Sequence, residues 1–231
     1  MDAIKRLIPL PLFNALAPTY HRTLAVLGAF IYGNPSRQLK IIAVTGTKGK
    51  SSVCEFLNAV LEHAGFKTAL ASTIRFKVGL HSVPNKRKMT MPGRFFLQRF
   101  LKEAKNEKCD WVIIEMTSEG VKQYRHEGLE LDALIFTNIA PEHIESHGSF
   151  ANYIAAKFEI GKTLERSKKQ QRVMVANVDD EYGADFLSLN VEYAVPYSLT
   201  DAKPYTVDDK GTEITFRGET IFSPIRGEFT I

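Results

Sequence analysis

The sequence predicts an α/β protein: a doubly wound, mainly parallel sheet with a P-loop, followed near the C-terminus by a small antiparallel β meander. Three observations predict this fold. Short apolar runs rich in β-branched residues alternate with stretches of helical periodicity, which favours parallel strands joined by right-handed crossovers. A glycine-rich turn joins the first of these strands to the first helix. From Pro204 onward, short strands separated by turn residues replace the helices.

The predicted strands and helices follow one another in a regular order. Residues 40–45 are expected to form a buried strand, and the apolar residues after it recur at helical spacing: Val53, Phe56, Leu57, Val60, Leu61 and Ala64. Further strands are predicted at 67–72, 111–115, 132–137 and 172–177, and further helices at 95–106 and 149–164. Ser149 suits the N-cap of the last helix. The strands of the meander are predicted at 205–208, 213–216 and 219–222.

The composition fits a globular protein and limits its partners. Of the 231 residues, 44% are apolar, which is enough for a core. The formal charge of +4 results from 30 basic and 26 acidic residues spread along the chain, so nucleic-acid binding is not indicated, while anionic substrates are tolerated. The two cysteines, Cys54 and Cys109, are too few for a disulfide framework and are expected to be reduced core residues of a cytoplasmic protein.

The N-terminal segment, residues 1–38, is predicted to be helical and amphipathic. The uncharged run after Arg22 contains Gly33, Asn34 and Pro35 and is shorter than the roughly 20 residues needed to span a bilayer. No transmembrane helix is therefore predicted, and no A-x-A-like site indicates a secretory signal. Two interpretations stay open: a helix packed on the domain, or an interfacial helix that docks on a membrane or a partner.

Polar residues end four of the predicted strands, namely Thr45, Glu115, Asn138 and Asn177. Ligands of open α/β sheets bind at the carboxyl ends of the strands, where these four residues would share one edge. Any one of them alone can be a turn or helix-capping residue. Their coincidence favours a binding site.

The turn after the first strand is the most specific part of this edge. Its sequence is Gly46-Thr47-Lys48-Gly49-Lys50-Ser51-Ser52. Glycines let backbone N–H groups turn toward a phosphate, Lys50 can reach the β and γ phosphates, and the Ser51 hydroxyl can bind Mg²⁺. Two residues rather than the usual four separate the glycines, so the motif alone is weak. Its place between a strand and a helix makes it a predicted phosphate site.

This shortened loop resembles that of the Mur ligase and folylpolyglutamate synthetase superfamily, and the likeness continues downstream in order. Residues 115–125 are similar to the Glu-Val-Ser-Ser-His segment of the MurE-type ligases, and residues 137–148 resemble their Thr-Asn-Leu-x-x-Asp-His-Leu-Asp-x-His-Gly run. Residues 153–157 and 177–180 match two further landmarks. The likeness covers roughly residues 41–180 and points to the central ATP-binding domain of the MurE-type UDP-N-acetylmuramyl peptide synthetases.

The resemblance implies a reaction in which ATP, with Mg²⁺, phosphorylates a carboxylate of a UDP-N-acetylmuramyl peptide, and an amino acid then forms an amide. This is a step of peptidoglycan precursor synthesis. The implied ATP contacts are Gly46, Thr47, Lys48, Gly49, Lys50, Ser51, Ser52, Asn138 and Asn177. The implied Mg²⁺ ligands are Ser51, Glu115, His143 and Lys157, and the implied substrate contacts are Thr90, Ser118, Gln123 and Arg125. Catalytic roles would belong to Lys50, His143 and Lys157.

Lys157 falls within an apolar helical stripe made of Phe150, Tyr153, Ile154, Phe158 and Leu164. A lysine at such a position can snorkel from the edge of the stripe. In the resembling family this lysine is carbamylated, and partial burial is consistent with that, because burial favours the neutral amine that adds CO₂. The product is a carboxylate on a long arm, which can bind a second Mg²⁺.

Three positions depart from the family pattern. The family usually has Thr-Thr-Pro where Met91 stands, His at the position of Glu119 and Asp at the position of Glu142. These departures affect substrate identity more than ATP use. Folylpolyglutamate and poly-glutamate synthetases are therefore the alternatives within the class.

A different class of function also stays open, an ATP-binding scaffold subunit that does not ligate. About 40 residues precede the loop, and residues 227–231 resemble the stretch that closes the family's central domain. The expected division is a helical segment at 1–38 and a central ATP-binding domain at 39–231, with the C-terminal ligase domain absent from this chain and supplied in cis or in trans. On this interpretation the chain alone binds ATP without completing ligation.

Overall fold

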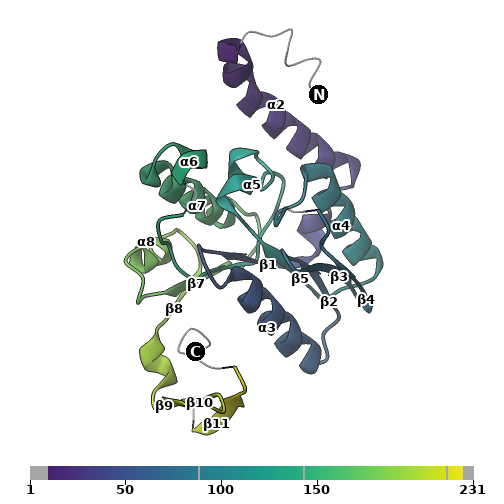
Figure 1. Ribbon diagram of the computed structural model, residues 1–231. Coiled ribbons are helices and arrows are strands. Elements are labelled where there is room, and N and C mark those ends of the chain that lie inside the picture. Colours follow the sequence, from purple (N-terminus) through teal and green to yellow (C-terminus); the bar gives the residue numbers. More distant parts are fainter. Residues whose placement is uncertain (1–9, 88, 143, 217, 226–231) are drawn as a thin grey trace.

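The computed structural model describes residues 10–87, 89–142, 144–216 and 218–225, and its centre is an eight-stranded sheet with the order β4-β3-β2-β5-β1-β6-β7-β8 (Figure 1). Six neighbouring strands are parallel: β2 (Thr68–Ala71), β5 (Trp111–Glu115), β1 (Lys40–Thr45), β6 (Ala133–Phe136), β7 (Val173–Asn177) and β8 (Tyr193–Tyr197). Two antiparallel strands extend the sheet beyond β2: β3 (Arg75–Val78) and β4 (His81–Pro84). The mainly parallel α/β sheet that the sequence predicts is thereby confirmed.

Helices pack on both faces of this sheet. One face is covered by α3 (Lys50–His63), whose Cys54 packs among Val44, Leu70 and Ile113 of three central strands. The opposite face carries α4 (Arg94–Asn106), α7 (Phe150–Glu165) and α8 (Gly183–Leu187) (Figure 1). Successive strand residues point to opposite faces, so each strand contributes to both cores.

The larger core is rich in aromatic contacts. Phe136 of β6 stacks on Phe186 of α8 with ring centroids 4.1 Å apart, and Phe158 of α7 stacks on the same ring at 4.5 Å. On the other face, Phe56 and Val60 share the helical spacing of the buried residues of α3 but are 51% and 64% exposed. The apolar stripe in the sequence is therefore wider than the face that α3 buries. Both cysteines are buried and unpaired, as expected.

The predicted strands and the helices expected at 95–106 and 149–164 lie within two residues of their expected bounds, and the helix expected after the first strand is α3. Ser149 caps α7 as predicted, because its side chain accepts a hydrogen bond from Asn152 N at 3.1 Å. The sequence analysis does not predict β3, β4 or β8. Every residue of β4 is exposed, and its sequence has no apolar run that would mark a strand. The sequence of β8 is apolar but contains Pro196, a residue that argues against a strand within a sheet. The short helices α5 (Ser118–Lys122), α6 (Ile144–His147) and α8 are also absent from the sequence prediction.

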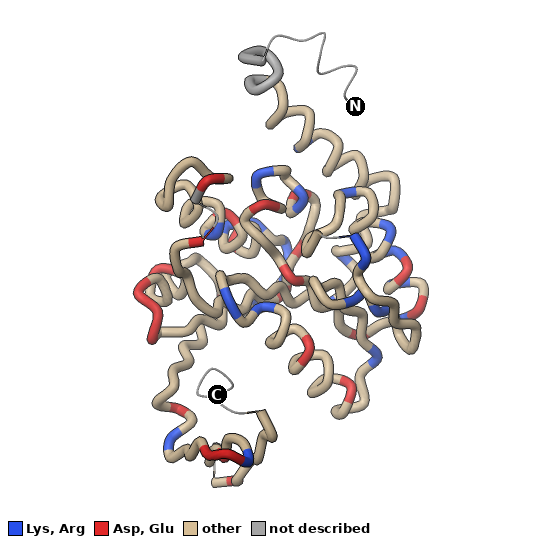
Figure 2. Tube along the Cα trace, viewed as in Figure 1, with Lys and Arg blue, Asp and Glu red and all other residues tan. Residues whose placement is uncertain are grey.

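The N-terminal helix α2 (Leu10–Ile31) packs on α4 at one end and projects from the body at the other, with the 3₁₀ helix η1 (Pro35–Gln38) after it (Figure 1). Ala25, Gly28 and Ala29 are its buried face. Charged residues of both signs are scattered over the molecule but nearly absent from α2 (Figure 2). No helix in the part of the chain that the structure describes combines the length and hydropathy of a membrane span.

A second, three-stranded sheet follows the 3₁₀ helix η2 (Leu199–Ala202). It consists of β9 (Tyr205–Val207), β10 (Thr212–Phe216) and β11 (Glu219–Ser223), with β10 between the other two. Both pairings are antiparallel, which confirms the predicted meander.

Candidate functional site

The carboxyl ends of β1, β5, β6 and β7 meet at one edge of the sheet. The parallel register pairs Val44 with Glu115, Thr45 with Phe136, and Phe136 with Ala176. The polar residues that end these strands therefore occupy neighbouring positions, as the sequence predicts. This edge is where an open α/β sheet binds its ligands.

The loop from β1 to α3 requires glycine at two positions. Gly46 has φ 150°, and a Cβ atom there would lie 1.9 Å from Thr137 Oγ1, so a side chain does not fit. Gly49 has φ 80° and is the N-cap of α3. Both backbone conformations favour glycine, which lacks the Cβ that opposes positive φ. The loop consequently passes close to β6 and presents the N-terminus of a 14-residue helix at the edge of the sheet.

Residues at the end of β6 brace this loop. Asn138 Oδ1 accepts a hydrogen bond from Lys48 N at 2.9 Å, Thr137 Oγ1 donates to Lys48 O at 2.7 Å, and Thr47 N donates to Asn138 O at 2.7 Å. Asn177 supports the brace from β7 by donating from Nδ2 to Thr137 O at 3.0 Å. The two asparagines expected to contact ATP thus hold the loop in shape.

A group of oxygen atoms lies where α3 begins. Ser51 Oγ donates to Glu115 Oε1 at 2.9 Å, and Thr73 N donates to Glu115 Oε2 at 2.7 Å. Thr73 Oγ1 lies 2.7 Å from Thr90 Oγ1. Hydroxyl and carboxylate oxygens are the donors that Mg²⁺ prefers, so Ser51 and Glu115 are suited to hold it. Of the two other expected ligands, His143 lies outside the described residues, and Lys157 lies on α7.

Within those described residues, no group of three or more His, Cys, Asp or Glu side chains could hold a metal ion. The donor set at the strand ends is therefore sparse. Mg²⁺ commonly keeps several waters and takes only one or two protein carboxylates together with substrate phosphates. A Ser51 and Glu115 pair beside a phosphate loop fits that pattern of coordination.

Two lysines face the same loop. Lys157 of α7 is 2% exposed, and its Nζ donates to Gly46 O at 2.5 Å and lies 4.7 Å from the centroid of the Tyr153 ring. Burial, followed by the charge of Lys50, lowers the pKa of Lys157 to about 7 against an opposing effect of Glu142. Lys157 is therefore buried rather than snorkelling from the stripe.

Lys50 is the second of these lysines. Its Nζ donates to Thr47 O at 2.8 Å. Burial lowers the pKa of Lys50, while the charges of Glu115 and Glu142 oppose that shift. Phosphate oxygens would be stronger acceptors for this ammonium group than a neutral carbonyl, because charge-assisted hydrogen bonds are roughly twice as strong as neutral ones.

A cavity of about 380 Å³ opens beside the two lysines. Its lining includes Gly46, Lys50, Lys157, Thr90, Ser118, Gln123 and Arg125. All four residues expected to contact the substrate are thus brought together with both lysines. Asn138 and Asn177 are not among its lining residues.

The sequence analysis did not predict the polar contacts that three residues make in this site. The hydroxyl of Tyr153 lies 2.8 Å from Thr47 Oγ1 and ties α7 to the loop. A tyrosine in a buried helical stripe usually has a hydrogen-bond partner for its hydroxyl, so the position of Tyr153 in the stripe could have indicated such a contact. Thr73 carried no such signal. His147 is buried with Nε2 3.1 Å from Ser118 Oγ, so it links α6 to the lining of the cavity.

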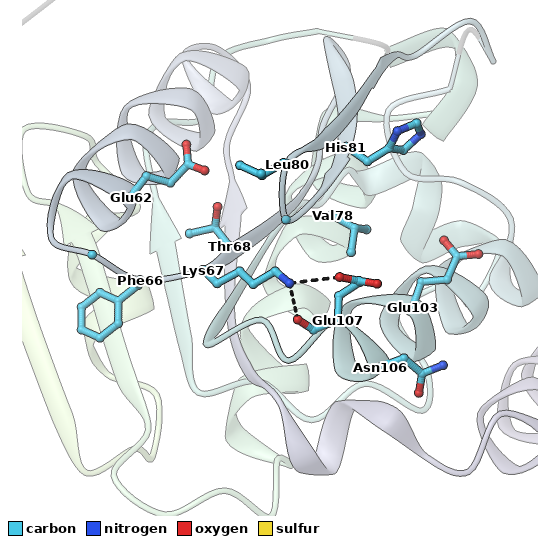
Figure 3. A pocket seen from close by; sticks show the side chains of 12 residues that line it. Glu62, Phe66, Lys67, Thr68, Val78, Leu80, His81, Glu103, Asn106 and Glu107 are labelled. Atoms are coloured by element: carbon cyan, nitrogen blue, oxygen red, sulfur yellow. Dashed lines mark hydrogen bonds and ion pairs between the residues drawn. The ribbon is translucent and has the colours of Figure 1, made fainter.

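A larger cavity, of about 970 Å³, lies at the amino end of β2 and is shown in Figure 3. In it, Lys67 Nζ donates to the Glu107 carbonyl at 2.5 Å and lies 3.0 Å from Glu107 Oε2. Not one of the expected site residues lines this cavity. Its position at the opposite end of the strand argues against a role in binding at the strand ends, although it is the larger of the two.

The α/β fold and the polar residues at the carboxyl ends of its strands define the class of this protein. The chain belongs to the Mur ligase middle domain family, whose sequence profile matches residues 44–231. The UDP-N-acetylmuramoyl-L-alanyl-D-glutamate--2,6-diaminopimelate ligase of Clostridium botulinum is 33% identical to it over 178 residues. That match covers 77% of this chain and 35% of the relative, so the chain spans about a third of the curated relative's length.

Solved structures show the same fold. A structure of a UDP-N-acetylmuramoyl-L-alanyl-D-glutamate--2,6-diaminopimelate ligase has a TM-score of 0.69 at 23% identity, covering 83% of this chain and 40% of that one. The Mycobacterium tuberculosis folylpolyglutamate synthase complexed with ADP has a TM-score of 0.65 at 14% identity, covering 90% and 55%. These similarities establish a shared architecture for the central sheet.

Proposed function

We propose that this chain is the ATP-using core of an acid–amino acid ligase that extends a UDP-N-acetylmuramyl peptide in peptidoglycan precursor synthesis. One observation carries the proposal: the amine of Lys157 is buried against the Gly46 carbonyl, in one cavity with Lys50, Ser118 and Arg125. The similarity to the Clostridium botulinum relative, a 2,6-diaminopimelate ligase, supports the same reaction class.

The residues of the chain have separate tasks in this proposal. Backbone N–H groups at the start of α3 and the ammonium of Lys50 bind the phosphates of ATP. Ser51 and Glu115 hold Mg²⁺, which when bound neutralises charge on the phosphates and on the attacking carboxylate. Arg125 and Ser118 orient the peptide, so that its carboxylate lies close to the γ phosphate.

The reaction then has two steps. A carboxylate oxygen of the peptide attacks the γ phosphorus, ADP leaves, and an acyl phosphate remains. The amine nitrogen of the amino acid attacks the acyl carbon, phosphate leaves, and the amine loses a proton as the amide forms. Most of the acceleration comes from positioning and from charge stabilisation, because phosphoryl transfer demands little covalent chemistry from the protein.

Trapping of the acyl phosphate tests the proposal. Residues 1–231 are incubated with ATP, Mg²⁺, hydroxylamine and a UDP-N-acetylmuramyl dipeptide, and mass spectrometry is expected to show the peptide hydroxamate. The same peptide amidated at its terminal carboxyl is the control. A parallel incubation with dihydropteroate tests the folylpolyglutamate alternative. Bound ATP with no hydroxamate from either acid would support the scaffold subunit instead.

A further inference from the structure

Glu119 stands where the resembling family usually has histidine, and it lines the cavity of about 380 Å³, which we call the substrate cavity. Its Oε1 atom accepts a hydrogen bond from Ser146 Oγ and lies 3.1 Å from His147 Nε2. Lys122 Nζ lies 4.0 Å from the same oxygen. The carboxylate of Glu119 is therefore engaged with α6. The mechanism proposed above gives neither Glu119 nor His147 a task.

His147 connects Glu119 with Ser118, which is expected to contact the substrate. The His147 side chain is 2% exposed, and its Nε2 atom lies 3.1 Å from Ser118 Oγ as well as 3.1 Å from Glu119 Oε1. The imidazole packs at 75° against the ring of Tyr153, with the ring centroids 5.3 Å apart. Both α5, which carries Ser118 and Glu119, and α6, which carries His147, pack on α7 (Figure 1). Three helices thus hold this group of side chains in place.

The surroundings of His147 Nε2 decide whether this nitrogen carries a proton. An ionised carboxylate only accepts hydrogen bonds. An unprotonated Nε2 would turn its lone pair toward a carboxylate oxygen at 3.1 Å, and two negative partial charges at that distance repel each other. A proton on Nε2 makes the same contact attractive, and the tautomer of a histidine is set by such neighbours. Glu119 therefore keeps a proton on Nε2 of His147.

A protonated Nε2 fixes the role of the Ser118 hydroxyl. The ring N–H donates to Ser118 Oγ, so the hydroxyl cannot donate its own proton to the ring. Within the described residues, His147 is the one hydrogen-bond partner of Ser118 Oγ. Thr117 Oγ1 accepts a hydrogen bond from Gly120 N at 3.2 Å and caps α5, which fixes the backbone at Ser118. Because Ser118 lines the substrate cavity, its hydroxyl proton is available to a ligand there.

We propose that Glu119 and His147 are positioning residues that commit the Ser118 hydroxyl to donate into the substrate cavity. This wall of the cavity then binds an oxygen atom that only accepts hydrogen bonds. A carboxylate of the substrate fits best, since hydrogen bonds to an ionised acceptor are roughly twice as strong as neutral ones, and Arg125 adds a cation to the same lining. The identity of the ligand rests on the proposed function, whereas the state of the imidazole does not.

The state of His147 is measured first, in the full chain without substrate. Long-range ¹H–¹⁵N NMR at mildly alkaline pH distinguishes protonated from unprotonated ring nitrogens, and His147→Gln assigns the resonances among the six histidines. Nε2 is expected to carry the proton. Glu119→Gln is expected to shift the Nε2 resonance toward the unprotonated value, because an amide side chain can also donate to this nitrogen. An unprotonated Nε2 in the wild type, or an unchanged resonance in Glu119→Gln, would overturn the proposal.

Calorimetry with the UDP-N-acetylmuramyl dipeptide measures the consequence for binding. Glu119→Gln is expected to weaken binding at least about threefold and His147→Phe at least about tenfold, whereas His147→Gln, which keeps an N–H donor, should recover part of the loss. Glu103→Gln on α4 is the matched control for both measurements, since Glu103 is similarly exposed and paired with Arg99 at 3.5 Å.

The two measurements separate this proposal from the proposed function. Equal dipeptide affinity in the wild type, Glu119→Gln and His147→Phe would overturn the positioning role. A wild type that binds no dipeptide, but whose Nε2 proton depends on Glu119, would support the positioning role and contradict the proposed function instead.

Discussion

Two lysines of this molecule are similarly buried and differ in what surrounds them. Lys77 is 6% exposed and forms an ion pair with Glu62 at 2.6 Å. Lys157 is 2% exposed and donates instead to the neutral Gly46 carbonyl. A carboxylate partner favours the ammonium, whereas burial against a carbonyl allows the free amine. Only the second environment prepares a lysine for reaction with CO₂.

We therefore expect Lys157 to carry a carbamate. The neutral amine nitrogen attacks the carbon of CO₂, a proton leaves, and a carboxylate remains on the side chain. In ¹³C-bicarbonate NMR at mildly alkaline pH, the carbamate resonance should be lost in Lys157→Ala and kept in Lys77→Ala. Since the pKa of Lys157 is about 7, the resonance should weaken as the pH falls below that value. A resonance that survives Lys157→Ala would assign the carbamate elsewhere.

The same lysine makes stability depend on pH. In the unfolded chain a lysine keeps its proton to about pH 10.4, whereas folded Lys157 loses it near pH 7. The unfolded state binds more protons between these values, so the free energy of unfolding rises with pH there, by at most about 1.4 kcal/mol per unit. Lys157→Met should remove this rise and be stabilising below pH 7. Denaturant titrations in CO₂-free buffer measure it, and a difference between wild type and variant that does not change with pH would contradict it.

Lys50 is the residue on which phosphate binding should depend most. Lys50→Ala is expected to weaken ATP binding at least about tenfold, or about 1.4 kcal/mol, because it removes the cation closest to the start of α3. Isothermal titration calorimetry measures the effect. Lys102→Ala on α4, remote from the loop, is the charge-matched control. Unchanged affinity in Lys50→Ala would exclude this lysine from the phosphate site.

At the scale of elements, α7 connects the loop with α6, which carries His147. Its position depends on its first turn, where Ser149 accepts a hydrogen bond from Asn152 N and Asn152 Nδ2 donates to His147 O at 3.0 Å. Further along the helix, Tyr153 contacts Thr47 and Lys157 contacts Gly46. A loss of the N-cap should therefore affect the loop as well as the helix.

Ser149→Ala is expected to lower the free energy of unfolding by about 1 kcal/mol, the usual effect of losing a side-chain N-cap. Thermal or denaturant unfolding measures this change. Ser188→Ala at the end of α8 is the control, since its hydroxyl donates to the Asp185 carbonyl at 2.7 Å and caps no helix N-terminus. Equal stability of Ser149→Ala and the wild type would show that the first turn of α7 is held by tertiary contacts alone.

At the scale of the whole molecule, the site lies at an edge of the sheet that water can reach. Amide formation needs the amine within about 3–3.5 Å of the acyl carbon, and it needs the exclusion of water that would hydrolyse the acyl phosphate. The match to the curated relative covers 35% of that relative's length. Such a relative therefore contains further segments, outside the part that this chain matches, that can hold the amine.

Residues 1–231 expressed alone are accordingly expected to bind ATP and release phosphate slowly, without forming an extended peptide. The assay combines the purified chain with ATP, Mg²⁺, a UDP-N-acetylmuramyl peptide and candidate amino acids, and mass spectrometry detects the product. Calorimetric ATP binding by the same preparation is the control for folding. An extended peptide would show that α2 or the sheet of β9, β10 and β11 closes the site.

The sequence by itself determined the central α/β sheet, the meander and the place of the candidate site. These follow from local properties: the period of the apolar residues, the glycines of the loop after Thr45, and the N-cap at Ser149. Because parallel strands align their carboxyl ends, the residues that close them, such as Glu115 and Asn177, could be placed together before any contact was known.

The tertiary structure alone decided the contacts between residues far apart in the sequence. Lys157 meets the carbonyl of Gly46 across 111 positions, and Tyr153 meets Thr47 across 106. No local pattern encodes these pairs, since they depend on how α7 packs against the sheet. Two further features also depend on packing: the ring nitrogens of His126, which lack a hydrogen-bond partner among the described residues, and the exposure of strands β4 and β8. Burial and hydrogen bonding are properties of the packed chain, not of any segment of it.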